Sequence, residues 1–240
     1  MKRLFGYIVS IVSLFLLSIT LSYYSLDAAN YYTSVEGKTG DALLEALAEL
    51  SIENHDYYTS YAELRDAFAS SDKSSSGKIY DFYTQTQMSS SWSGGHFDRE
   101  HVWCQSLTNG LYGETGAGAD LHHIRPTYDN INSSRGNMKY AEISGGTAKY
   151  YSVANDKVST SSSDLLYGYT ANSTFEPIAS VKGDVARIVM YVYMHYSKEI
   201  SANSKHSYAG QMYITNIIST SAGTADAAFD LLLEWNASDP

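Results

Sequence analysis

Three short polar motifs within residues 98–137 constrain the fold of this chain more than any other feature. The first is Asp98-Arg99-Glu100-His101, and the second, over residues 120–126, reads Asp-Leu-His-His-Ile-Arg-Pro. The third, over residues 130–137, reads Asn-Ile-Asn-Ser-Ser-Arg-Gly-Asn. A glycine-rich stretch separates the first two motifs and reads as a loop. The stretch between Glu100 and Asn132 is long enough for a strand, a loop, a second strand and the start of a helix, and we expect this order.

The residue types in these motifs suit a hard cation, a water molecule and a phosphate. Glu100 offers a carboxylate oxygen and Asn132 an amide oxygen, and Mg²⁺ prefers such ligands. His101 titrates near neutrality, so it can accept a proton from water. Arg135 can grip a phosphate through two hydrogen bonds, or it can pair with a carboxylate inside the fold. The sequence leaves both roles of Arg135 open.

The neighbouring positions of Glu100 and His101 predict an irregular backbone. Side chains alternate between the two faces of a regular strand, so adjacent residues point in opposite directions. The two can share one site only if the strand ends, turns or bulges over residues 100–102. We expect structural roles for His122, His123 and Asn137, with one of the histidines holding the loop by hydrogen bonds.

Taken in order and at this spacing, the motifs resemble the bacterial endonuclease I family of His-Me-finger (ββα-metal) nucleases. Downstream segments share the resemblance: residues 175–177 (Phe-Glu-Pro), 182–187 (Lys-Gly-Asp-Val-Ala-Arg) and 232–236 (Leu-Leu-Glu-Trp-Asn), so that it covers roughly residues 40–240. One departure is Cys104, which stands where close relatives have proline after His-Val-Trp.

The resemblance implies a metal-dependent, nonspecific endonuclease. Its expected substrate is DNA, with RNA left open. Glu100 and Asn132 would be the metal ligands and His101 the general base, and we include Arg135 among the catalytic residues. The expected cation is Mg²⁺, with Mn²⁺ or Ca²⁺ as alternatives, and the expected active-site segment is 98–137.

Outside the motifs, hydrophobic periodicity predicts a mainly helical α+β fold. Helices are expected over residues 40–50, 61–69, 184–198 and 225–236, and strands over residues 78–84, 150–153 and 167–169. Gly183-Asp184 is expected to begin the third helix. The last helix is expected to dock through Phe229, Leu232, Leu233 and Trp235, even without the segment that follows it in relatives.

The first residues read as a targeting segment. Lys2 and Arg3 precede an apolar run over residues 4–21, and Ala28 and Ala29 supply small residues for cleavage. We therefore expect a signal peptide over residues 1–29, followed by one secreted or cell-surface domain over residues 30–240. The domain is expected to be monomeric and away from the membrane after cleavage. An uncleaved membrane anchor is the alternative, because the run is long enough to span a bilayer.

The charge and the cysteine content limit the kinds of function that the chain can have. The chain holds 16 Lys and Arg against 26 Asp and Glu, a net charge of −10, so any attraction of a nucleic acid must be local. Its single cysteine excludes an internal disulfide and disfavours a structural zinc site. Two other classes stay open. One is a carbohydrate- or cell-wall-binding module with a structural Ca²⁺ site, and the other is a zinc hydrolase using His101, His122 and His123.

Overall fold

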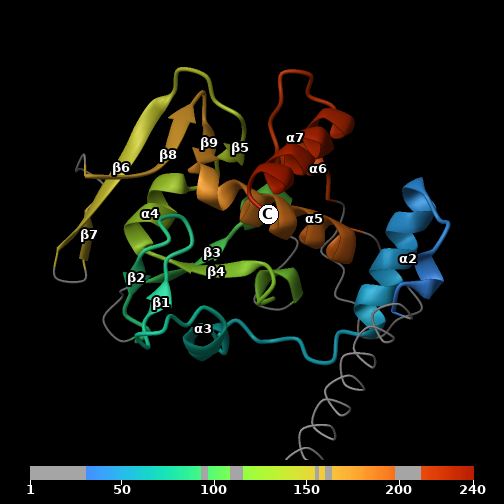
Figure 1. Cartoon of the computed structure of the whole chain (residues 1–240), viewed down its shortest axis with the longest axis horizontal. Coiled ribbons are helices and arrows are strands. Elements are labelled where there is room, and N and C mark those ends of the chain that lie inside the picture. The colour runs from blue at the N-terminus through green and yellow to red at the C-terminus, as the bar shows by residue number, and fades with distance from the viewer. Residues whose placement is uncertain (1–30, 93–96, 109–115, 155–156, 160–163, 198–211) are drawn as a thin grey trace, which may run out of the picture. The chain divides into compact units, whose positions relative to one another are not determined.

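The structure, a computed structural model, describes residues 31–92, 97–108, 116–154, 157–159, 164–197 and 212–240. It is a mixed α+β fold in which helices hold more residues than strands, as predicted (Figure 1). The predicted signal peptide lies outside the described residues. The chain divides into two compact units, Met1–Leu50 and Ser51–Pro240, and all the predicted site residues belong to the second.

The described part of the first unit contains a short 3-10 helix, η1 (Thr33–Val35), and most of helix α2 (Gly40–Glu53). Helix α2 confirms the helix predicted over residues 40–50. The leucines of this helix are half-buried, whereas Glu45 and Glu49 are exposed.

Two helices form the hydrophobic centre of the second unit. Helix α5 (Ala179–Tyr196) packs against α7 (Ala225–Ser238), which begins at the capping residue Thr224. The predicted start of α5 at Gly183-Asp184 is wrong, because the helix begins at Ala179, directly after Ile178. Gly183 serves packing instead: a Cβ at this position would lie 1.8 Å from the carbonyl oxygen of Asp239. Glycine therefore lets the end of α7 approach the backbone of α5.

The predicted docking face of α7 is only partly right. Leu232 and Trp235 are buried and Phe229 is half-buried, but Leu233 is 56% exposed. Polar contacts also hold this end of the chain. The Gly183 amide donates to Asp239, and Arg187 donates to Asn236 and to the carbonyl of Asp239. Two of the three downstream segments of the family resemblance, residues 182–187 and 232–236, thus meet each other in space.

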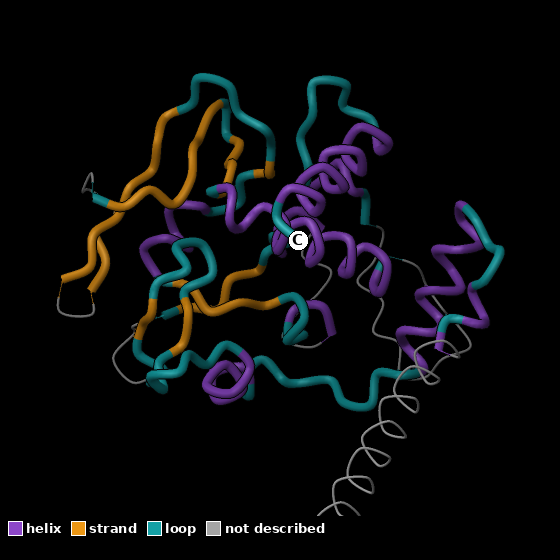
Figure 2. The backbone as a smooth tube through the Cα atoms, in the orientation of Figure 1, coloured by secondary structure: helices purple, strands orange, loops and turns teal. Residues whose placement is uncertain are grey.

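A five-stranded sheet lies beside these helices, in the upper left of Figure 2. Its order is β5 (Lys139–Tyr140), β9 (Thr174–Pro177), β8 (Leu165–Ala171), β6 (Thr147–Ala154) and β7 (Lys157–Ser159). Only the β5–β9 pair is parallel. The strands predicted over residues 150–153 and 167–169 lie within β6 and β8. The strand predicted over residues 78–84 is shorter, since only β1 (Ile79–Tyr80) is extended and pairs with β2 (Gln87–Met88).

The three polar motifs form a hairpin followed by a helix. Strand β3 (Asp98–His101) pairs antiparallel with β4 (Ile124–Thr127), and α4 (Asp129–Arg135) begins two residues after β4 ends. In this register Glu100 lies opposite Arg125 and His101 opposite Ile124. The expected order of strand, loop, strand and helix is therefore confirmed.

A buried carboxylate fixes the junction between β4 and α4. Asp81 accepts hydrogen bonds from the Thr127 hydroxyl and the Tyr128 amide through Oδ1. Its Oδ2 accepts from the amide and hydroxyl of Thr84. Asp81 thereby joins the turn after β1 to the segment between β4 and α4, the helix that carries Asn132. The last short helices described are α3 (Leu64–Ser71), η2 (Gln105–Thr108), η3 (Gly116–Gly118) and α6 (Ile214–Ile217).

Candidate active site

All four predicted site residues line one cavity of about 220 Å³. Glu100 and His101 come from the end of β3, and Asn132 and Arg135 from α4. Strand β3 ends at His101 and the chain bends at residues 102–103, as the sharing of one site required. The remaining lining residues are Cys104, Gln105, Ser106, Gly136 and Asn137.

Glu100 is buried, and one of its oxygens is held by two neighbours. The Tyr83 hydroxyl donates to Oε1 at 2.6 Å, and Nη1 of Arg135 lies 3.3 Å from the same oxygen. Burial raises the pKa of Glu100 to about 7, against the opposing effects of the Arg135 charge and the Tyr83 hydrogen bond. Both of these contacts are to Oε1. No described residue donates a hydrogen bond to Oε2, so Oε2 is the oxygen that could bind a ligand.

Asn132 is oriented by the first residue of β3. Its Nδ2 donates to Oδ2 of Asp98 at 2.9 Å. Because the amide nitrogen is used in this contact, Oδ1 is the atom left to accept a ligand. The cavity therefore offers one carboxylate oxygen, Oε2 of Glu100, and one amide oxygen, Oδ1 of Asn132. In each side chain the other polar atom already contacts the protein.

His101 is half-buried beside these oxygens. Burial lowers its pKa to about 4, although a hydrogen bond with the backbone of Gly118 opposes the shift. The imidazole is therefore neutral at pH 7. Hydrogen bonds with the backbones of Gly118 and Arg99 help to hold the ring. A neutral imidazole has one ring nitrogen with a lone pair, which can accept a proton from water.

Arg135 is 1% exposed and its guanidinium points into the fold. It donates to the carbonyls of His101, Val102 and Gly136 and to the Cys104 sulfur. It also lies over the Tyr140 ring, 4.6 Å from its centre. These contacts favour the structural role over the phosphate-binding role, since they hold the bend that lets Glu100 and His101 share the cavity.

Cys104 lies under Arg135 at the edge of the cavity. Its side chain is buried, and burial raises the pKa of the thiol to about 11. The thiol is therefore protonated at neutral pH and is a poor nucleophile or metal ligand.

His123 joins two loops and is not placed to bind a metal. The Trp103 amide donates to its Nε2 at 2.9 Å, and its Nδ1 donates to the Ala117 carbonyl at 2.6 Å. Burial lowers the pKa of His123 to about 3. Both ring nitrogens are occupied, which agrees with the predicted structural role and argues against a zinc site that includes His123.

The loop before β4 is fixed by a row of accepted hydrogen bonds. The carbonyls of Ala117, Gly118 and Ala119 accept from His123, His101 and the Thr59 hydroxyl, respectively. Three neighbouring peptide groups are thus held by three different parts of the chain. The position of His101 depends on this loop, because its ring donates to the middle carbonyl.

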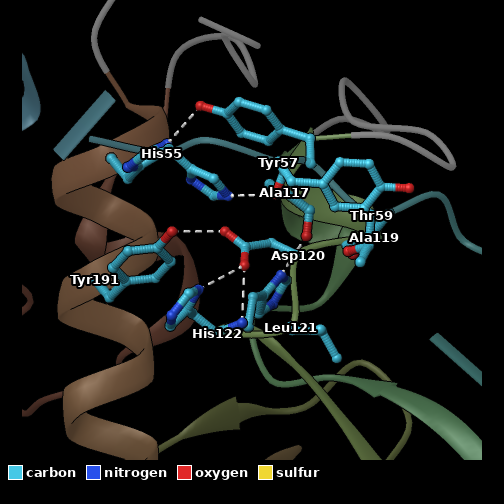
Figure 3. Close-up of polar contacts among 12 residues, drawn as sticks. His55, Tyr57, Thr59, Ala117, Ala119, Asp120, Leu121, His122 and Tyr191 are labelled. Carbon is cyan, nitrogen blue, oxygen red and sulfur yellow. Dashed lines mark hydrogen bonds and ion pairs between the residues drawn. The ribbon is translucent and has the colours of Figure 1, made fainter. Parts of the chain in front are cut away.

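Asp120 connects the same loop to α5, and sequence reasoning missed this connection. Its Oδ2 accepts from the Tyr191 hydroxyl at 2.6 Å, and its Oδ1 from the amide and ring of His122 (Figure 3). The Tyr196 hydroxyl also donates to Oδ2, at 2.7 Å. Burial alone would raise the pKa of Asp120, but these hydrogen bonds outweigh it and hold the pKa well below its usual range. In the sequence, Asp120 stands out only as a member of the second polar motif, and no sequence feature distinguishes Tyr191 or Tyr196 from the other tyrosines.

Asp120→Asn is expected to lower the free energy of unfolding at pH 7 by about 1–3 kcal/mol, because the amide cannot accept all four hydrogen bonds. The folded pKa lies below the unfolded one, so the contribution of the carboxylate is complete above about pH 4 and disappears as the pH falls through the folded pKa. Urea unfolding followed by tryptophan fluorescence should show a difference that is constant from neutral pH down to about 5 and then shrinks. Asp230→Asn, at an exposed position of α7, is the control; a difference that grows in acid would contradict this account.

The profile of the endonuclease I family matches residues 39–240. The chain belongs to the endonuclease I family. It is 31% identical over 224 residues to an extracellular ribonuclease of Bacillus subtilis (strain 168), which covers 89% of this chain and 67% of that protein. An extracellular ribonuclease of Bacillus amyloliquefaciens is 30% identical over 227 residues, covering 90% and 68%. No solved structure matches the chain.

Membership of this family makes the chain a nuclease, with nucleic acid as its substrate. The predicted alternative, a carbohydrate-binding module, is therefore not supported. Within the described ranges, no helix is both long enough and apolar enough to cross a membrane.

Proposed function

We propose that this nuclease is an exported endonuclease that hydrolyses the backbones of DNA and RNA with one divalent cation. The observation that carries the proposal is the cavity in which Glu100, His101 and Asn132 meet. One oxygen of Glu100 and the amide nitrogen of Asn132 are engaged by the protein, so each residue has one oxygen left for a cation.

The donor atoms fit Mg²⁺, with Mn²⁺ and Ca²⁺ as alternatives. A carboxylate oxygen and an amide oxygen are hard ligands, and Mg²⁺ commonly takes few protein ligands and keeps several waters. Among the described residues, no group of three or more His, Cys, Asp and Glu side chains could hold a metal. Two oxygen ligands are therefore proposed, and substrate oxygens would complete the coordination. When bound, the cation would stabilise negative charge on the phosphoryl group and the leaving oxygen.

The residues of the chain perform the other parts of the reaction. His101 takes a proton from the attacking water. Its low pKa keeps the ring neutral, so the acceptor is present at every pH near neutrality. Arg135 and Tyr83 hold Glu100 in place, and Asp98 orients Asn132. None of these contacts reads a base, which supports cleavage with little sequence preference.

The two relatives supply the argument for RNA and for export. Both are named extracellular ribonucleases. Because a water nucleophile requires no 2′-hydroxyl, the same site can cut DNA as well as RNA. We also propose that residues 1–29 are a signal peptide and that residues 30–240 are the secreted, monomeric domain.

Incubation of the purified protein with plasmid DNA and with long RNA, in Mg²⁺ and in EDTA, tests the proposal. We expect nicked and linear plasmid before small fragments, degradation of both polymers, and no activity in EDTA. RNA fragments should lack a 2′,3′-cyclic phosphate, because water is the proposed nucleophile. Full activity in EDTA or cyclic phosphate ends would contradict the proposed chemistry.

Substitution of the proposed ligands should weaken metal dependence. Asn132→Ala and Glu100→Gln are each expected to raise the Mg²⁺ concentration at half-maximal rate at least about tenfold, and added Mg²⁺ should partly restore the rate. Cleavage rates across Mg²⁺ concentrations, with calorimetry of metal binding, measure the effect. Asn137→Ala is the matched control, since Asn137 lines the same cavity but is not a proposed metal ligand. Equal effects of Asn132→Ala and Asn137→Ala would remove Asn132 from the ligand set.

A further inference from the structure

Two arginines and two aromatic rings form a continuous stack beside the proposed active site. The guanidinium carbon of Arg65, on α3, lies 4.2 Å from the centre of the Trp92 ring. Arg99, on β3, lies 4.9 Å from the same ring and 3.4 Å from the centre of the Tyr61 ring. We name these four residues the arginine–aromatic stack.

The stack begins at the proposed general base. The Tyr61 ring lies 5.9 Å from the ring of His101, and Arg99 directly precedes Glu100 in β3. From the cavity the order is therefore Tyr61, Arg99, Trp92 and Arg65. The two guanidinium carbons lie no more than about 9 Å apart, because both contact the Trp92 ring. Since this is an upper limit, the two guanidiniums can reach only phosphates that lie close together on a strand.

The two arginines of the stack differ in their contacts, since Nη1 of Arg99 donates to the Tyr61 carbonyl at 2.8 Å whereas Arg65 lacks a matching acid among the described residues. No described carboxylate forms an ion pair with Arg65, and its Nε is buried without a hydrogen-bond partner in the described structure. An arginine stacked on an aromatic ring uses the face of its guanidinium and keeps the edge donors for hydrogen bonds, a geometry that suits phosphate. In a chain with a net charge of −10, such arginines are local cations in an otherwise repulsive field.

We propose that the arginine–aromatic stack binds the phosphates of the substrate strand on one side of the bond that is cut. Arg99 contacts the phosphate nearest to the cavity and Arg65 contacts one farther along the strand. Trp92 and Tyr61 hold the guanidinium planes and read no base. The inference rests on the proposed role of His101, because that residue defines where the cut occurs.

A purely structural stack is the competing explanation, since Tyr61 and Trp92 are half-buried and pack against the core. The two explanations differ in what Arg65 does. A structural arginine contributes to folding, whereas a phosphate-binding arginine contributes to affinity for long substrates and to its salt dependence. Arg65 is the residue to test, because it is the member of the stack farthest along from the cavity.

Binding of a labelled single-stranded oligonucleotide of about twenty nucleotides to the full chain, measured by fluorescence anisotropy, tests the proposal directly. Binding is measured in EDTA at several salt concentrations, so that it does not depend on the proposed metal site. Arg65→Gln is expected to weaken binding about tenfold and to reduce the slope of log affinity against log salt by about one. Arg65→Lys should keep most of the salt slope. Lys73→Gln removes the same charge from an exposed position just after α3 and should change affinity less than about twofold.

Cleavage kinetics in Mg²⁺ supply the second measurement. For the long oligonucleotide, the loss in Arg65→Gln should appear in KM with little change in kcat. Hydrolysis of bis(p-nitrophenyl) phosphate, which has no flanking phosphates, should change less than about twofold. Equal loss on both substrates, or unchanged binding in EDTA with an unchanged salt slope, would overturn the proposal. An effect of Lys73→Gln as large as that of Arg65→Gln would also overturn it, because it would show general electrostatics. Failure of the metal-dependent chemistry would instead abolish cleavage by the unsubstituted protein and leave its binding in EDTA intact.

Discussion

His101→Ala is expected to slow phosphodiester cleavage at least about a hundredfold, the lower range for loss of a general acid–base group. The reason is that His101 supplies the neutral ring nitrogen beside the two proposed ligand oxygens. Metal binding should be largely retained, because the proposed ligands are Glu100 and Asn132. Single-turnover rates on plasmid DNA measure the first effect, and calorimetry with Mg²⁺ or Mn²⁺ measures the second.

His122→Ala is the matched control for this prediction. His122 is a histidine of the neighbouring motif, but its side chain is 70% exposed and it pairs with Asp120 outside the cavity. It should keep most of the cleavage rate. A His101→Ala variant that loses metal binding while Glu100→Gln retains it would reverse the roles assigned to these two residues.

Arg135→Met is expected to lower the free energy of unfolding by about 3–5 kcal/mol, the usual cost of removing one partner of a buried ion pair. The variant leaves Glu100 without its charged neighbour and leaves the carbonyls of His101 and Val102 without a donor. Chemical denaturation of the purified variant measures the change. Arg187→Met, on a half-exposed side chain of α5, should cost about 1 kcal/mol or less.

The same variant separates the two roles predicted for Arg135. If its stability were unchanged while KM for nucleic acid rose strongly, the phosphate-binding role would be correct. In that case the buried contacts seen for the guanidinium would not describe the protein during catalysis.

The sequence predicted the parts of the site that lie close together along the chain. Glu100, His101 and Asn132 belong to motifs that resemble those of the endonuclease I family, and the alternation rule correctly predicted that the strand would end, turn or bulge over residues 100–102. The hairpin and α4 were expected from the family resemblance and from the room that the spacing of the motifs leaves for them.

The sequence could not reveal the residues that hold the site. Tyr83 contacts Glu100 across 17 positions, and Tyr196 contacts Asp120 across 76. Such pairs depend on how helices and loops pack, and a single tyrosine among twenty-two carries no mark of its partner. The start of α5 was missed for the same reason. Gly183 looks like a helix boundary in the sequence, whereas in the structure it makes room for the carbonyl of Asp239.

The burial of Cys104 has a consequence for the durability of the protein outside the cell. Extracellular fluids are oxidising, and an accessible thiolate there forms sulfenic acid or cross-links two copies of a protein. The only thiol of this chain lies beneath the guanidinium of Arg135 and stays protonated. If the protein is exported as proposed, its cavity should remain chemically unaltered in air-exposed medium without any reducing agent.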